Sequence, residues 1–306
     1  MSDEFELALP ASSANLGPAF DTAAMALNFY LRVRARRAAT PSLIAYGRDP
    51  DMCRDARDHM IVDVYRRTLA SVGQPAPTLA LRLDNEIPIG KGCGSSAAAR
   101  LAGVALAAHF GQLDWGAQQI CDTAAQAEGH ADNVAACWWG GLVVTQTDSG
   151  RGVRWLRIPV AATWPLLLVV PPLPLATATA RQVLPETYRR RDAVANVQNA
   201  VMLLQAFQHG RADLLADASV DYLHQPYRAS LCPLLDVLQR LVGTAGIIGC
   251  VLSGAGPSVL LVLRDSLHQP AALEAAQRAL DQATMNAELL PAMLEPDGPG
   301  MDWRRS

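Results

Sequence analysis

The chain has 306 residues, which is too long for one ordinary domain and long enough for two. It is 50% hydrophobic and 18% charged, a composition that excludes intrinsic disorder, collagen and a simple coiled coil. The formal net charge is −3, so there is no basic excess to hold nucleic acid or an anionic membrane. We therefore expect a globular protein with no nucleic-acid and no membrane partner.

The sequence also lacks a recognisable targeting segment. Its first residues are acidic and do not show the basic-then-apolar order of a secretory signal. The most apolar stretch, 164–175, is short and contains four prolines, so no span of about 20 apolar residues exists. The six cysteines form no Cys-x-x-Cys pair and lie mostly in apolar runs. This pattern indicates buried free thiols in a reducing compartment, and we expect a soluble, cytoplasmic protein.

Hydrophobic spacing predicts a mixture of strands and helices in the first half of the chain. Strands are expected where apolar and polar residues alternate, over 5–9 (broken by Pro10), 27–35, 79–83 and, after two glycines, 142–145. Helices are expected over 58–72, 97–110 and 114–128.

The second half continues the mixture. Short apolar runs predict strands over 166–170, 247–252 and 259–263, and helical spacing predicts helices over 193–207, 213–222, 233–242 and 271–286. Neither a regular βαβ period nor a repeat of about 20–50 residues is present, which favours the α+β class over a doubly wound sheet. The proline-rich region 150–165 is the best boundary, so we predict domains at 1–155 and 156–306.

The sharpest local feature is the glycine-rich segment 88–99. Alternate glycines let the backbone approach a ligand closely, and the following serines and alanines begin a helix whose free N–H groups and positive dipole end make an anion site. A phosphate chain is the natural occupant, and a flexible turn before a helix is the alternative. The segment matches neither the Walker A loop nor the dinucleotide-binding fingerprint. The residues predicted to bind this phosphate chain are Pro88, Gly90, Lys91, Gly92, Cys93, Gly94, Ser95, Ser96 and Ala97.

Two other segments are polar loops within apolar surroundings. The first, 10–21, presents the amide of Asn15 and the carboxylate of Asp21; taken alone, it reads as a connecting loop with turn hydrogen bonds. The second, Ser253-Gly-Ala-Gly-Pro-Ser258, lies between two buried strands, where glycines permit close approach of main chain to a ligand. Taken alone, it reads as a tight hairpin.

Together and in this order, the three segments resemble the signature motifs of the GHMP kinases (galactokinase, homoserine kinase, mevalonate kinase and phosphomevalonate kinase). The pattern is most similar to that of the homoserine kinases, whose first motif is Pro-Ala-Ser-Ser-Ala-Asn-Leu-Gly-Pro-Gly-Phe-Asp. Further matches are Glu-Gly-His-Ala-Asp-Asn-Val-Ala-Ala at 128–136, Thr-x-x-Ala-Arg-x-x-Leu-Pro at 177–185 and Gln-Pro-Tyr-Arg at 225–228. The likeness spans residues 10–263.

The chain departs from that pattern at several positions. Small side chains replace a glycine, a leucine and two prolines at Ala19, Cys93, Ala131 and Ala136. These changes should preserve the backbone path. His59 stands where family members usually carry an Asn-Leu pair near the adenine, so the base preference stays open.

The resemblance implies a two-domain α+β GHMP kinase fold. Its N-terminal domain would be ribosomal protein S5 domain 2-like, with a left-handed βαβ-type element, and its C-terminal domain ferredoxin-like. ATP would place its phosphates over 90–96, and Ser96 (or Ser95) and Glu128 would hold Mg²⁺ through oxygen atoms. A helix-end carboxylate is the structural alternative for Glu128. A homodimer is common in the family.

The acceptor implied by the resemblance is an amino acid with a terminal hydroxyl group, L-homoserine. Two arginines would bind its carboxylate, carboxylates would bind its ammonium group, and an amide would orient it. The predicted substrate-binding residues are Asn15, Asp21, His130, Asp132, Arg181, Arg228 and Gly254. For His130, a core histidine bonded to backbone is the alternative.

The resemblance also bears on the chemistry. Asn133 lies where mevalonate kinases carry an aspartate thought to act as a base, and an amide takes no proton at neutral pH. We therefore predict transfer without a strong general base, with Asn133, Glu128 and Ser96 as the catalytic set. Lys91, the one lysine, either screens a terminal phosphate or lies at an exposed loop tip.

Three functions remain open at this stage. The first is a homoserine kinase that makes O-phospho-L-homoserine for threonine synthesis. The second is a GHMP kinase for another small hydroxy amino acid or alcohol, against which Arg181 and Arg228 argue because a substrate without a carboxylate would not need both. The third is a non-catalytic ligand sensor, which would have no need to keep Glu128 and Ser96.

Overall fold

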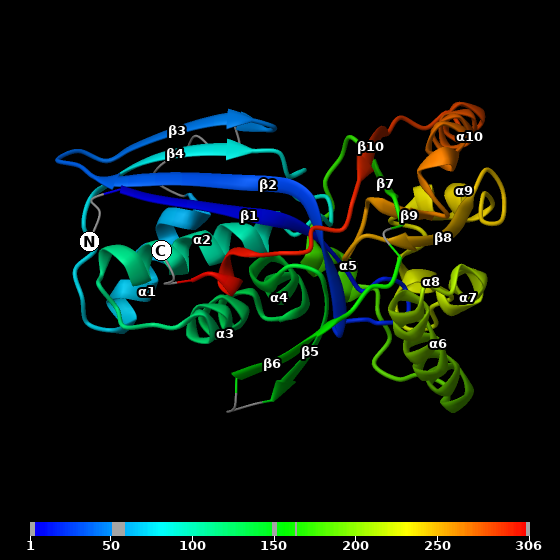
Figure 1. Ribbon diagram of the computed structural model, residues 1–306, viewed down its shortest axis with the longest axis horizontal. Coiled ribbons are helices and arrows are strands. Elements are labelled where there is room, and N and C mark those ends of the chain that lie inside the picture. Colours follow the sequence, from blue (N-terminus) through cyan, green and yellow to red (C-terminus); the bar gives the residue numbers. More distant parts are fainter. Residues whose placement is uncertain (1–3, 51–58, 149–151, 163, 304–306) are drawn as a thin grey trace.

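The computed structural model describes residues 4–50, 59–148, 152–162 and 164–303. Two sheets, each packed with helices, lie side by side along the long axis of the molecule (Figure 1). The first sheet has six strands in the order β3-β4-β2-β5-β6, and β1 pairs with β2. Its strands are β1 (Glu4–Ala14), β2 (Ala23–Arg37), β3 (Ser42–Gly47), β4 (Leu79–Asn85), β5 (Leu142–Asp148) and β6 (Gly152–Ile158).

Four helices gather on one face of the first sheet: α1 (Met60–Ser71), α2 (Ser95–Phe110), α3 (Ala117–Glu128) and α4 (Asp132–Trp139) (Figure 1). Helix α2 is alanine-rich and buried along most of its length, because small side chains let other elements approach it closely. Gly103 is one such position, where an added Cβ would lie 2.7 Å from Cβ of Val64 on α1. Strands β3 and β4 pair in parallel with α1 between them, which gives a βαβ element.

The second sheet is antiparallel, in the order β10-β7-β9-β8. Its strands are β7 (Leu166–Val170), β8 (Ile247–Leu252), β9 (Val259–Leu263) and β10 (Glu288–Ala292). The associated helices are α5 (Thr177–Gln182), α6 (Arg190–His209), α7 (Ala212–Ala218), α8 (Gln225–Arg228), α9 (Pro233–Gln239) and α10 (Gln269–Gln282). Numbered within this domain, the strand order is fourth, first, third, second with helices in the two crossovers, which is the ferredoxin-like arrangement.

The core continues from one sheet to the other. Leu203, Phe207 and Leu215 of α6 and α7 belong to the same apolar cluster as the residues beneath the first sheet. Helices α9 and α10 cover the opposite face of the second sheet with a separate cluster. The α+β class and the two-part architecture are therefore as predicted.

Some boundaries differ from the predicted ones. The first strand does not break at Pro10; it continues to Ala14, and a register shift between Pro10 and Ala11 accommodates the residue that cannot donate a ladder hydrogen bond. Helix α7 ends at Ala218 instead of 222, because Asp221 accepts hydrogen bonds from the N–H groups of the following turn. Residue 58, the predicted start of the first long helix, lies outside the described residues.

The division at residues 155 and 156 stays a prediction. Strand β6 spans it and pairs with β5 in the first sheet, so the chain leaves that sheet only after Ile158. The last described residues return to the first sheet: Leu294 bridges to Leu27, and the Trp303 ring lies 5.4 Å from that of Trp138 (Figure 1).

Two further observations concern predictions made from composition. Within the described ranges, no helix combines the length and apolarity that a membrane crossing requires. Five of the cysteines lie in those ranges, and all five are buried free thiols, as predicted: Cys93, Cys121, Cys137, Cys232 and Cys250. Cys53 lies outside them.

Candidate active site

The three segments that the sequence singles out meet at the junction of the two sheets. The backbone N–H of Ser12 donates to the carbonyl oxygen of Cys93 at 3.1 Å. The Ser253 hydroxyl donates to the Gly92 carbonyl at 2.7 Å, and the Gly254 N–H donates to the Ala14 carbonyl at 3.0 Å. Each segment is thus hydrogen-bonded to the other two, although they lie far apart in the sequence.

The glycine-rich loop needs its glycines for this contact. Gly92 has φ +78°, and an added Cβ would lie 2.2 Å from the Ser253 carbonyl oxygen. Gly94 has φ +73°, and an added Cβ would lie 2.0 Å from the Ser12 hydroxyl. Helix α2 begins at the next residue, so its unpaired N–H groups and positive dipole end face the pocket that this loop lines. This geometry suits an anion.

One pocket brings together nearly all the predicted site residues, from both halves of the chain: Asn15, Asp21, Gly90, Gly92, Cys93, Gly94, Ser95, Ser96, Glu128, His130, Asp132, Asn133, Arg181, Arg228 and Gly254. Three predicted phosphate-binding residues do not line it. Pro88 and Ala97 are buried behind the loop, and Lys91 is half-buried. The lining also includes four residues that the sequence did not indicate as site residues: Phe20, Leu175, Thr177 and Ala255. All but Leu175 lie within the matched motifs.

Two oxygen atoms in this pocket are suited to a divalent cation. Glu128 is the last residue of α3, and its Oε2 accepts a hydrogen bond from the Ser96 hydroxyl at 2.9 Å. The guanidinium group of Arg100 forms an ion pair with the same Oε2 at 2.5 Å and also contacts the Ser96 hydroxyl. A cationic side chain thus already lies against this hydroxyl–carboxylate pair, and hard oxygen ligands are those that Mg²⁺ prefers.

The residues after α3 form a polar network at the start of α4. His130 Nδ1 lies 3.2 Å from Asp132 Oδ1. Burial alone would lower the pKa of His130, but the hydrogen bond and charge of Asp132, with the charge of Glu128, outweigh it and raise that pKa. The side chain of Asn133 accepts a hydrogen bond from the Ser12 hydroxyl at 2.8 Å, so its oxygen faces a donor.

Two arginines reach the pocket from the second half of the chain. Arg181 on α5 pairs with both carboxylate oxygens of Asp21, at 2.6 and 3.0 Å. Arg228 on α8 is only 1% exposed, and its polar contacts are neutral: Nε donates to the Ala180 carbonyl and Nη1 lies 2.9 Å from His224 Nδ1. Both guanidinium groups also lie over the Phe20 ring, 5.5 Å (Arg181) and 5.3 Å (Arg228) from its centre.

Arg228 is therefore a buried cation without an acidic partner, since no carboxylate in the described part of the chain forms an ion pair with it. Burial, together with the nearby charge of Arg181, lowers the pKa of Arg228. An isolated buried charge is costly unless it is compensated. The pocket is thus suited to receive a carboxylate from a ligand.

The loop between β1 and β2, which carries Asp21, has an uncommon backbone conformation. Asn15 and Asp21 have φ of +70° and +52°. The Asn15 side chain donates to the Gly254 carbonyl at 2.7 Å and accepts from the Asp21 N–H at 3.0 Å. It therefore fixes the position of Asp21, and its role in orienting a substrate stays a prediction. Non-glycine residues with such φ values are frequent at functional sites.

His59 caps α1, because its Nδ1 accepts a hydrogen bond from the Ile61 N–H at 3.2 Å, and burial lowers its pKa. Residues 51–58 before it lie outside the described ranges, so base recognition stays a prediction.

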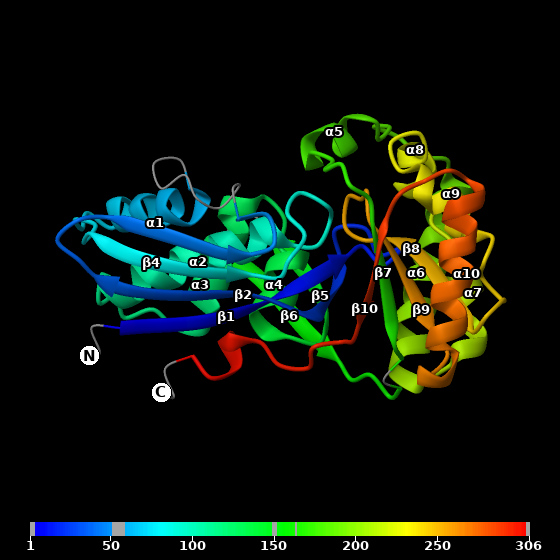
Figure 2. The same cartoon turned by 90° about the horizontal axis from the view of Figure 1, so that it is seen from above.

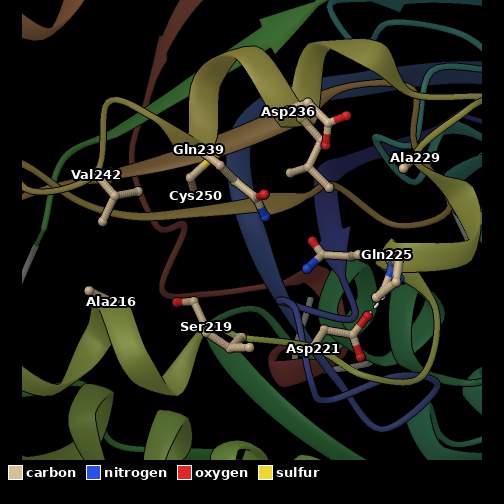
Figure 3. A pocket seen from close by; sticks show the side chains of 12 residues that line it. Ala216, Ser219, Asp221, Gln225, Ala229, Asp236, Gln239, Val242 and Cys250 are labelled. Carbon is tan, nitrogen blue, oxygen red and sulfur yellow. Dashed lines mark hydrogen bonds between the residues drawn. The ribbon is translucent and has the colours of Figure 1, made fainter.

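A second cavity, of about 460 Å³, opens between α7, α8 and α9 (Figure 3). None of the predicted site residues lines it. Its wall includes Asp221 and Gln225, which hold the turn that leads into α8: the Asp221 carboxylate accepts from three N–H groups of that turn, and the Gln225 side chain accepts from the Leu252 N–H. This cavity therefore lies behind the element that carries Arg228.

Comparison with known proteins agrees with this geometry. The family model "GHMP kinases N terminal domain" matches residues 59–141, and "GHMP kinases C terminal" matches residues 203–283. The chain is 45% identical over 257 residues to a homoserine kinase of Solibacter usitatus, covering 84% of each chain. The chain belongs to the GHMP kinase family.

Other relatives match this GHMP kinase over most of its length. A homoserine kinase of Synechocystis is 36% identical over 274 residues, which cover 87% of this chain and 88% of that protein. The crystal structure of homoserine kinase from Cytophaga hutchinsonii superposes with a TM-score of 0.83 over 97% of each chain, at 25% identity. A mevalonate kinase of L. major, at 16% identity and a TM-score of 0.75, shares the fold.

Proposed function

We propose that this GHMP kinase is a homoserine kinase, which transfers the γ-phosphoryl group of ATP to the side-chain hydroxyl of L-homoserine and forms O-phospho-L-homoserine, an intermediate of threonine synthesis. The observation that carries the proposal is the buried Arg228, which has no acidic partner in the described chain and lies beside Arg181 in the candidate pocket. The substrate carboxylate would compensate this charge. The names of the most similar relatives support the same substrate.

The nucleotide would place its phosphates against the loop 90–96 and the first turn of α2. Backbone N–H groups at a helix N-terminus bind such an anion without requiring a lysine. Ser96 and Glu128 would hold Mg²⁺, which when bound neutralises charge on the phosphates. Lys91 is half-buried and does not line the pocket, so its contact with a terminal phosphate stays a prediction.

The amino acid would occupy the space between the two arginines and the acidic residues. Its carboxylate would contact Arg228 and Arg181, and its ammonium group would contact Asp21 or Asp132. Arg181 and Asp21 now pair with each other, so a zwitterionic substrate would replace that pair with one contact to each partner. His130 would close the pocket wall beside Asp132.

The chemistry then depends on positioning. The substrate hydroxyl oxygen attacks the γ-phosphorus, the bond from this phosphorus to the β,γ-bridging oxygen breaks, and ADP leaves with that oxygen. The hydroxyl proton passes to the transferred phosphoryl group or to solvent, because Asn133 is an amide and takes no proton. In a loose transition state, alignment and charge compensation supply most of the rate acceleration.

The test is an ADP-release assay with L-homoserine, L-threonine and mevalonate in parallel. We expect turnover with L-homoserine to exceed that with the other two by a large factor. Preference for another alcohol would make the chain a sister kinase of the same fold. ATP binding without turnover of any acceptor would instead indicate a ligand sensor. A cytoplasmic location and a homodimer, both expected from the family resemblance, stay predictions.

A further inference from the structure

Of the arginines in the described ranges, Arg100 is the one in contact with both candidate metal ligands. It lies one helical turn after Ser96 on α2, with its side chain 22% exposed, and its Nη1 contacts Glu128 Oε2 at 2.5 Å and the Ser96 hydroxyl. Its Nε donates to the carbonyl oxygen of Ala127 at 2.9 Å. The guanidinium group is therefore anchored at two separate points of α3, and its planar geometry fixes its direction.

Because of this anchoring, the two oxygens of the Glu128 carboxylate have different contacts. Oε2 is occupied by Arg100 and Ser96, whereas Oε1 faces His130, whose Nε2 lies 3.8 Å away. Only Oε1 is left without a short contact, and the carboxylate is 9% exposed. Arg100 thus sets the orientation of Glu128 and also compensates its charge.

A compensated carboxylate attracts a divalent cation less strongly than a free one. The described residues also contain no group of three or more histidine, cysteine, aspartate or glutamate side chains arranged to hold a metal. We propose that Arg100 is a positioning residue that keeps the affinity of the nucleotide-free enzyme for a divalent ion low. The ion then enters together with the nucleotide phosphates. This proposal rests on the proposed kinase function.

The test measures Mn²⁺ binding to the full-length protein without nucleotide, by electron paramagnetic resonance of the free ion. We expect wild-type protein to bind Mn²⁺ weakly, and Arg100→Gln to bind it about tenfold more tightly, because the charge that compensates Glu128 is removed. Arg100→Lys retains the positive charge and should stay close to wild type. Adding Glu128→Gln to Arg100→Gln should abolish the gain.

Arg67→Gln is the matched control. Arg67 forms an exposed ion pair with Asp63 within α1, so its loss should leave Mn²⁺ binding unchanged. Folding of each variant is checked by circular dichroism. A folded Arg100→Gln protein with unchanged or weaker Mn²⁺ affinity, or a wild type that binds Mn²⁺ tightly without nucleotide, would overturn the proposal.

A second readout separates this role from simple structural support. In the presence of saturating ATP, the Mn²⁺ affinities of wild type and Arg100→Gln should converge, because the phosphates then supply most of the ligands. A tenfold difference that persists with ATP contradicts entry with the nucleotide. Neither measurement involves homoserine or turnover. The Mn²⁺ results can therefore be interpreted even if the substrate assignment fails, and the substrate assay can be interpreted even if the Arg100 proposal fails.

Discussion

Arg228 and Glu128 are two buried charges whose surroundings differ in one respect. Glu128 has a cationic partner in Arg100, whereas Arg228 contacts a carbonyl oxygen, an imidazole nitrogen and an aromatic ring. The pocket therefore offers a positive charge at Arg228, which has no ion-pair partner in the described chain, and a negative charge at Glu128, which Arg100 compensates. The first attracts a carboxylate, and the second restrains the binding of a free cation.

The catalytic roles of two neighbouring polar residues can be separated by mutation. We expect Glu128→Ala to lower kcat about 100-fold or more, because it removes a charge that acts on the phosphates through the divalent ion. Asn133→Ala should lower kcat by a smaller factor, since its side chain is an amide hydrogen-bonded to Ser12 and accepts no proton. Steady-state kinetics at saturating ATP and acceptor give both values. If Asn133→Ala is the more damaging change, the mechanism without a strong base is wrong.

The residue types at the site were predictable from sequence, but their pairings were not. The motif likeness indicated Asp21 and Arg181 as partners of the substrate, and the structure shows them paired with each other across 160 positions. Arg100 carried no signal, because a single arginine on a helix is normally a solvated surface residue. Contacts of this kind depend on how α2 and α3 pack, which local sequence patterns do not specify.

At the level of elements, the loop–helix junction before α2 leaves no room for an added methyl group at Gly94. We expect Gly94→Ala to abolish or strongly weaken nucleotide binding, because the Cβ would displace the Ser12 hydroxyl, which also holds Asn133. Both the left-handed backbone and the contact oppose the substitution. Binding is measured by titration with a fluorescent ATP analogue.

Gly73→Ala is the control for that experiment. Gly73 also has positive φ, +70°, but nothing lies within 4 Å of the added Cβ. Both variants should lose about 1 kcal/mol of stability from the backbone conformation, and only Gly94→Ala should lose nucleotide binding. Equal binding by the two variants would show that the contact with Ser12 is not needed for the phosphate site.

The elements themselves were predictable where burial alone defines them. Strands β7, β8 and β9 have the bounds that their apolar runs predict, because a proline, glycine or polar residue lies at each end of these runs. Three strands, β3, β6 and β10, were not predicted, and each is a partly exposed strand at the end of its sheet. Helix α8 has four residues and depends on hydrogen bonds that the side chains of Asp221 and Gln225 accept, which no periodicity reveals.

In the whole molecule, the active-site pocket depends on how the two sheets are placed relative to each other. Its phosphate side comes from elements beside the first sheet, and its arginines come from α5 and α8 beside the second (Figure 2). Within the described chain, an ion pair joins the two parts outside the pocket: Arg48, which follows β3, binds both carboxylate oxygens of Glu288 at the start of β10. This pair is partly exposed, with side chains 27% and 46% accessible.

The contribution of the Arg48–Glu288 ion pair to the free energy of unfolding should depend on pH. The hydrogen bonds from Arg48 lower the pKa of Glu288, so its contribution to stability is present above the ordinary carboxyl pKa and is lost as the pH falls through the lowered value. We expect Glu288→Gln to reduce the free energy of unfolding by about 0.5 kcal/mol at pH 7, with a smaller difference from wild type below about pH 4. Urea unfolding at both pH values measures this.

Glu274→Gln is the control, because it breaks an exposed ion pair within α10. That pair joins two residues of one helix, so its loss should have a smaller effect on the free energy of unfolding at pH 7. A Glu288→Gln difference that is unchanged at low pH would mean that the ion pair does not stabilise the junction.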